Sequence, residues 1–91
     1  MTMRQILIGE VDLTDGAGAV MTCRYHLLVR EIPPPLAGES YGIGVTISQT
    51  GERAEIWDIT LCQRRIEALA GLVMEGTVTP CTLRDVMDDW L

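Results

Sequence analysis

Apolar and polar residues alternate along much of the first sixty positions of the chain, as they do in β-strands with one buried face. The alternation is cleanest in segment 20–32, where apolar residues occupy nearly every odd position up to Val29. Turn-forming residues separate the alternating runs: Asp-Gly-Ala-Gly at 15–18, three prolines at 33–35 and Thr-Gly at 50–51. The pattern predicts four strands, over residues 4–13, 20–32, 41–49 and 52–59.

The period of the apolar residues changes from that of a strand to that of a helix after Thr60. Apolar residues recur every three or four positions through 61–76, which predicts a helix there. Thr60 followed by Gln63 has the pattern of a capping box, and Gly76 suits the C-cap.

A second helix start follows directly, because Thr79 can cap a helix and Pro80 suits its first position. Four apolar side chains then share one helical face: Leu83, Val86, Met87 and Trp90. Strands followed by helices predict an α+β fold. We expect a four-stranded antiparallel sheet (a meander) followed by two C-terminal helices packed on one face, as a single domain over residues 1–91.

The turn between the last two strands also predicts how they pair. A two-residue loop at 50–51 would place Val45 opposite Ile56 on an apolar face. On the other face it would place Trp57 opposite Gly44, so that the indole covers exposed backbone.

A three-residue loop at 16–18 would sort the side chains of the first two strands onto two faces. The helices would cover the cleaner apolar face, to which Cys23 belongs. The other face would hold three cross-strand pairs: Glu10 with Arg24, Ile8 with His26 and Ile6 with Leu28. Since two helices cover only one face, the second is predicted to be partly apolar and to form an interface through Ile6, Ile8, Arg24, His26, Leu28 and Trp57.

Composition and charge restrict the kinds of partner that the chain is expected to bind. Its 91 residues include 7 basic and 13 acidic ones, for a net charge of −6, and every basic residue is arginine. An acidic chain without lysine is poorly suited to phosphate backbones, so no nucleic-acid partner is expected. No apolar run approaches the roughly 18 residues of a membrane helix, and the first residues lack the pattern of a secretory signal. We therefore expect a cytoplasmic location and no membrane partner.

The residue types that usually carry chemistry form no recognisable motif. The three cysteines lie far apart, at 23, 62 and 81, and make no metal-ligand spacing with the single His26. Gly42-Ile43-Gly44 lies inside a strand and not before a helix, which does not suit a phosphate-binding loop. The acidic residues at 85, 88 and 89 lack the turn of a calcium loop. We expect no catalytic residue, metal or cofactor, and no enzymatic activity.

Four short motifs follow one another in the second part of the chain: Tyr25-His26-Leu27-Leu28-Val29-Arg30-Glu31, Tyr41-Gly42-Ile43, Asp58-Ile59-Thr60, and Pro80 with Leu83-Arg84-Asp85-Val86 and Asp89-Trp90-Leu91. In this order they resemble a family of short bacterial proteins, found mainly in Gram-positive anaerobes and classed as a domain of unknown function. The resemblance covers about residues 25–91. It implies a single domain, and no activity, cofactor or catalytic residue.

Two classes of function remain open. The favoured one is a non-catalytic interaction module that forms a homodimer or docks on a protein partner through its helix-free face. The alternative is a small-ligand sensor with a pocket between the sheet and the helices, where Tyr41 and Asp58 are among the few polar groups on offer.

Overall fold

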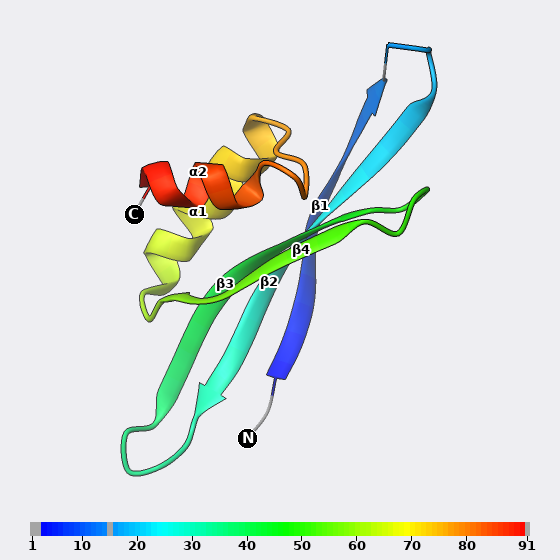
Figure 1. Cartoon of the computed structure of the whole chain (residues 1–91). Coiled ribbons are helices and arrows are strands. Elements are labelled where there is room, and N and C mark those ends of the chain that lie inside the picture. Colours follow the sequence, from blue (N-terminus) through cyan, green and yellow to red (C-terminus); the bar gives the residue numbers. More distant parts are fainter. Residues whose placement is uncertain (1–2, 15, 91) are drawn as a thin grey trace.

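The computed structural model describes residues 3–14 and 16–90, without the side chain of Trp90. Figure 1 shows a twisted four-stranded sheet with two helices on one of its faces. The strands pair in the order β1-β2-β3-β4, all antiparallel, which confirms the predicted α+β meander. The elements are β1 (Met3–Thr14), β2 (Val20–Ile32), β3 (Gly38–Ile47), β4 (Arg53–Thr60), α1 (Gln63–Glu75) and α2 (Leu83–Trp90).

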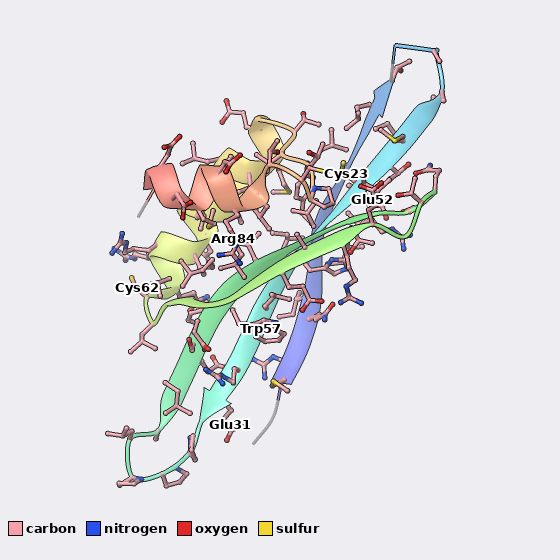
Figure 2. All side chains as sticks on the ribbon, in the orientation of Figure 1. Cys23, Glu31, Glu52, Trp57, Cys62 and Arg84 are labelled. Carbon is pink, nitrogen blue, oxygen red and sulfur yellow. The ribbon has the colours of Figure 1, made fainter. Side chains whose placement is uncertain are left out.

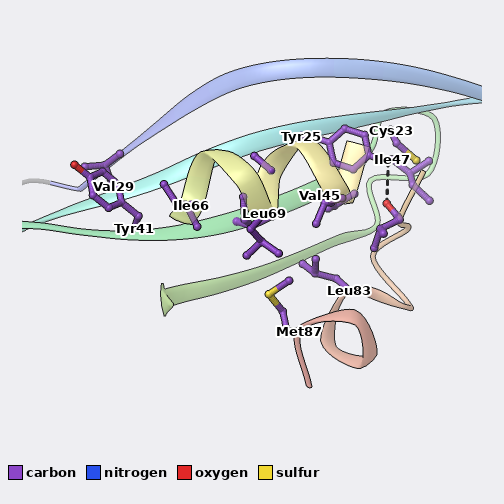
Figure 3. Close-up of a cluster of buried hydrophobic side chains, with 14 residues drawn as sticks. Cys23, Tyr25, Val29, Tyr41, Val45, Ile47, Ile66, Leu69, Leu83 and Met87 are labelled. Carbon is purple, nitrogen blue, oxygen red and sulfur yellow. Dashed lines mark hydrogen bonds between the residues drawn. The ribbon is translucent and has the colours of Figure 1, made fainter. Parts of the chain in front are cut away.

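The hydrophobic core lies between the helices and the two central strands (Figure 3). The odd positions of β2 face the helices, as the alternation predicts, and Cys23 and Tyr25 are fully buried there. Both helices contribute apolar side chains to the same layer, among them Ile66, Leu69, Leu83 and Met87.

The pairing of β1 with β2 follows the predicted register only over residues 9–14 of β1. Glu10 lies opposite Arg24, as expected, but the register shifts between Leu7 and Gly9. The extra residue at this β-bulge exchanges the two faces of β1 below it. Gly9 lies under α1 at the bulge, where an added Cβ would come within 2.6 Å of the Met74 Sδ atom.

The bulge overturns two of the predicted interface placements. Ile6 lies opposite Leu27 and not opposite Leu28, so it points to the helix side of the sheet. Ile8 lies at the bulge itself and packs against the helix-side core. Leu7 takes the position opposite His26 on the helix-free face.

The hairpin between β3 and β4 is longer than predicted. The Ile47 N–H donates to the Glu52 carbonyl at 2.8 Å, which leaves residues 48–51 as a four-residue loop, and Gly51 within it has a positive φ of 77°. Val45 consequently lies opposite Ala54 and not opposite Ile56. Because the shift is by two residues, each side chain stays on its predicted face.

A second irregularity, in β4, explains Gly42. Residues 57–59 of β4 face this single glycine of β3, and Asp58 adopts a positive φ of 57° to make the bend. A Cβ on Gly42 would overlap the Ile56 carbonyl oxygen and lie 2.8 Å from the Trp57 Cα atom. The neighbouring backbone therefore excludes a side chain here. The predicted position of Trp57 opposite Gly44 is wrong, because Glu55 takes that place.

The two helices begin later than their sequence signals predict. The N-cap of α1 is Cys62, without a side-chain cap, and Thr60 instead accepts a hydrogen bond from the Cys62 N–H at 3.1 Å. Gly76 is the C-cap, as expected. Before α2, Thr79 and Pro80 lie in a turn closed by the Thr82 N–H on the Thr79 carbonyl.

The predicted apolar face of α2 is confirmed where its side chains are described. Leu83 and Met87 are buried, and Val86 packs against the core. Trp90, the fourth predicted core residue of this helix, has its side chain outside the described part of the chain.

One buried hydrogen bond joins the sheet to the connection between the helices. The Tyr25 hydroxyl donates to the Val78 carbonyl at 2.9 Å, drawn as a dashed line in Figure 3. Burial is the main reason that the pKa of Tyr25 is raised well above its ordinary value. The hydroxyl therefore stays protonated, and able to donate to this carbonyl, to a higher pH than an ordinary tyrosine.

We predict that Gly42→Ala destabilises the fold by about 2–3 kcal/mol or more, because the overlap falls on backbone atoms that cannot move aside cheaply. Gly71→Ala is the matched control: its added Cβ meets nothing within 4 Å in the helix, and the change should stabilise by about 0.5–1 kcal/mol. Urea unfolding of both variants measures the difference. Equal midpoints for the two would show that β4 does not cross Gly42 closely.

We predict that Tyr25→Phe lowers the free energy of unfolding by about 1–3 kcal/mol, because it leaves the buried Val78 carbonyl without its donor. Tyr41→Phe is the control and should cost less, since its hydroxyl donates to Glu39, whose carboxylate also reaches water. Denaturant titrations of both variants give the comparison. A Tyr25→Phe protein as stable as wild type would mean that the hydroxyl does not hold the interhelical connection.

Candidate functional site

Four of the six predicted interface residues share the helix-free face of the sheet. Arg24, His26 and Leu28 occupy even positions of β2, opposite the buried row that the helices cover. Figure 2 shows Trp57, from β4, on the side of the sheet away from both helices. As described above, the bulge in β1 removes the other two, Ile6 and Ile8, from this face.

The apolar centre of this face is more closed than the sequence predicts. Leu28 is 0% exposed although no helix covers its side of the sheet. One of its methyl groups lies 3.4 Å from the position that a Cβ on Gly44 would occupy, so the absent side chain makes room for it. The half-buried Trp57 ring is held in place by its Nε1 donor on a Glu55 carboxylate oxygen at 2.9 Å.

Ion pairs surround this apolar centre. Arg30 donates to both carboxylate oxygens of Asp58, and this is the main reason that the pKa of Asp58 lies below its ordinary value. Two further pairs of the same kind lie on this face: Arg24 with Glu10, and Arg53 with Glu55. The charges of the face are therefore largely compensated within the chain, and such exposed pairs contribute little to stability.

His26 lies on the same face as two of these arginines, Arg24 and Arg53, in the neighbouring cross-strand row. Burial is the first cause that lowers its pKa, and the positive charges of Arg24 and Arg53 add to the effect. Its imidazole is therefore mostly neutral at pH 7.

Three of the exposed large apolar side chains come from β1, and sequence reasoning assigned only one of them to an interface. Met3 is 63% exposed, Leu7 is 50% exposed and Ile6 is 42% exposed. Met3 and Leu7 lie on the helix-free face, whereas Ile6 lies on the other. Gly9 was the available signal, because an isolated glycine within a strand pattern indicates a bulge and hence an exchange of faces.

Residues 3–7 of β1, called the edge segment below, lie at the rim of the sheet. Figure 1 shows this half of β1 directed away from both helices, and no described strand pairs with its outer side. Its one charged residue, Arg4, does not blunt the rim: its guanidinium reaches back to Glu39 of β3 and bonds to its Oε2 at 2.7 Å.

Residues 4–91 match a protein family that is described as a family of unknown function, DUF6514. The chain belongs to DUF6514. The match begins earlier than the resemblance at residue 25 suggested, so it takes in nearly all of β1 and the edge segment. No curated protein and no solved structure matches the chain.

Other kinds of site were sought in the described part of this DUF6514 chain. Cys23 is buried, as predicted, whereas Cys62 and Cys81 are exposed. Among the described residues, no cluster of potential metal ligands and no pocket is found. Neither of the described helices is long and apolar enough to cross a membrane.

We predict that the single histidine of the chain titrates below its ordinary pKa of 6.5. A base whose pKa is lowered by folding stabilises the fold fully above pH 6.5, and this contribution is lost as the pH falls towards the folded-state pKa. NMR titration of His26 gives the pKa directly. Between pH 7.5 and pH 5.5, the urea midpoint should fall more for the wild type than for His26→Gln. A measured pKa of 6.5 or higher would contradict the surroundings described here.

Proposed function

We propose that this DUF6514 protein is a non-catalytic protein-interaction module that binds through the edge segment of β1 and the adjoining helix-free face. The observation that carries the proposal is the exposure of Met3, Ile6 and Leu7 on both faces of an edge strand. Exposed apolar strands at a sheet edge are natural sites of strand addition and association.

The other rim of the sheet supports this choice by contrast. β4 is also an edge strand, but none of its large apolar residues is among the exposed ones, and it is interrupted by the bulge at Asp58. The second half of β1 carries the bulge at Ile8 and the acidic residues Glu10 and Asp12. Bulges and charges are the usual means of protecting an edge, and residues 3–7 lack both apart from the paired Arg4.

On the helix-free face, the border with β1 offers a partner more exposed apolar surface than the centre does. Leu28 is fully covered, so it offers no area to a partner. Leu7 lies beside His26 on that face and remains half exposed. A partner on the edge segment would therefore contact Leu7, and it would leave the Trp57 and Leu28 centre undisturbed.

The proposal includes two expectations that come from the sequence: a cytoplasmic location, and a bacterial family found mainly in Gram-positive anaerobes. The alternative function, a small-ligand sensor, stays a prediction, and the described residues form no pocket that favours it. The two polar groups named for such a pocket are already engaged: the Tyr41 hydroxyl donates to Glu39, and Asp58 accepts from Arg30.

Photo-crosslinking in the cells that produce the protein tests the proposal. A photoreactive amino acid at Leu7 should give a discrete protein adduct, whereas the same amino acid at Leu72, an apolar α1 residue 54% exposed, should not. The adduct should decrease at least several-fold when Met3→Glu is added, because a buried charge opposes the contact. Equal adducts from both positions, or none from Leu7, would overturn the proposal.

A further inference from the structure

We propose that the partner of the edge segment is a second copy of this chain, bound antiparallel, β1 to β1, about a twofold axis at Gln5. The inference rests on the proposed function and specifies its partner. Joining two sheets in this way produces one continuous eight-stranded sheet with both pairs of helices on the same face.

The symmetry restricts the registers that are available. Two antiparallel strands in one sheet exchange under a twofold axis only when that axis is perpendicular to the sheet. Side chains opposite one another then point to the same face. The axis must pass midway between one residue and the same residue of the partner, which lie directly opposite each other. Within the edge segment, the candidates for that residue are Arg4, Gln5 and Ile6, since an axis at either end would leave most of the segment unpaired.

An axis at Gln5 fits the side chains of the edge segment best. It places Met3 opposite the partner's Leu7, and by symmetry it makes the same contact twice, which covers the two most exposed apolar side chains of the segment. Ile6 lies opposite the partner's Arg4, whose guanidinium is engaged by Glu39 of its own chain, so its apolar stem is what Ile6 meets.

The neighbouring registers are worse. An axis at Arg4 places two arginines opposite one another, and directly opposed like charges are unfavourable. An axis at Ile6 places Leu7 opposite the partner's Gln5 and brings Arg4 against the bulge at the partner's Ile8. An axis at Ile6 does pair Ile6 with its own copy, but it leaves Met3 and Leu7 without an apolar partner. Only the axis at Gln5 pairs Met3 with Leu7 while it keeps the arginines apart.

The extent of the pairing is limited by the same bulge. Beyond Leu7 the strand changes face and continues to the acidic Glu10 and Asp12, which would approach no basic residue of the partner's edge segment. Five residues a side bury well under the roughly 1,200 Å² of a standard interface. The dimer is therefore weak and depends on concentration.

Disulfide trapping tests this register. Residues directly opposite across an antiparallel pair have Cα atoms about 4.5–5.5 Å apart, within the range of about 4.4–6.8 Å that a disulfide needs. In a background with Cys62→Ser and Cys81→Ser, which removes the exposed thiols, the Gln5→Cys variant should form a crosslinked dimer under mild oxidation.

Three variants in the same background control the experiment. Arg4→Cys and Ile6→Cys test the neighbouring registers, because an axis at Gln5 separates each from its own copy by two residues along the strand. Thr14→Cys, exposed at the far end of β1, measures random collision. We expect the Gln5→Cys dimer to exceed each of these at least several-fold. Circular dichroism melting of every variant confirms that it is folded.

Sedimentation of the unmodified chain completes the test. The apparent mass should rise from 10.0 kDa towards twice that value with concentration, and Leu7→Glu should abolish the rise while Leu72→Glu leaves it unchanged. Dimers that trap best at another position would overturn the register. A strictly monomeric chain that still gives the Leu7 photo-adduct would show that a foreign strand occupies the edge: the inference then fails and the proposed function stands.

Discussion

Two short helices can cover only one face of a four-stranded sheet, and the rest of the structure follows from this shortage of cover. The helices contain 13 and 8 residues, and their apolar side chains are used on the row that includes Tyr25. The hydroxyl of Tyr25 also ties the interhelical connection to the sheet. The helix-free face must therefore be closed by side chains from the sheet itself.

Closure of that face depends on the two glycines of β3. Gly44 gives Leu28 the space to lie flat against the sheet, and Gly42 lets the bulged β4 backbone approach closely. The bulge also directs Asp58 towards Arg30, and the Arg30 guanidinium donates two hydrogen bonds to the Asp58 carboxylate. The face thus gains a small covered apolar centre and a ring of paired charges without a second layer of helices.

The strands and the buried row of β2 were predictable from the sequence, because a period of two records which face is buried. The predicted pairing of β3 with β4 was wrong by two residues. A shift of two leaves every side chain on the same face, so the apolar pattern cannot reveal it. The bulge at Ile8 was not predicted, and it moved Ile6 and Ile8 off the expected interface. Its position suits a contact between Gly9 and Met74, 65 residues later in the chain, and alternation within one strand carries no record of such a contact.

The same shortage of cover explains why the edge segment is the part of the sheet left for a partner. α1 reaches β1 at Gly9, where Met74 packs, and the side chain of Ile8 fills the neighbouring core. Beyond that point no helix remains, so Ile6 is exposed on one face while Met3 and Leu7 are exposed on the other. A partner layer over one face would leave the opposite side chains in water. A strand added at the rim brings side chains to both faces and also satisfies the backbone, and it is therefore the form of partner that this surface accommodates best.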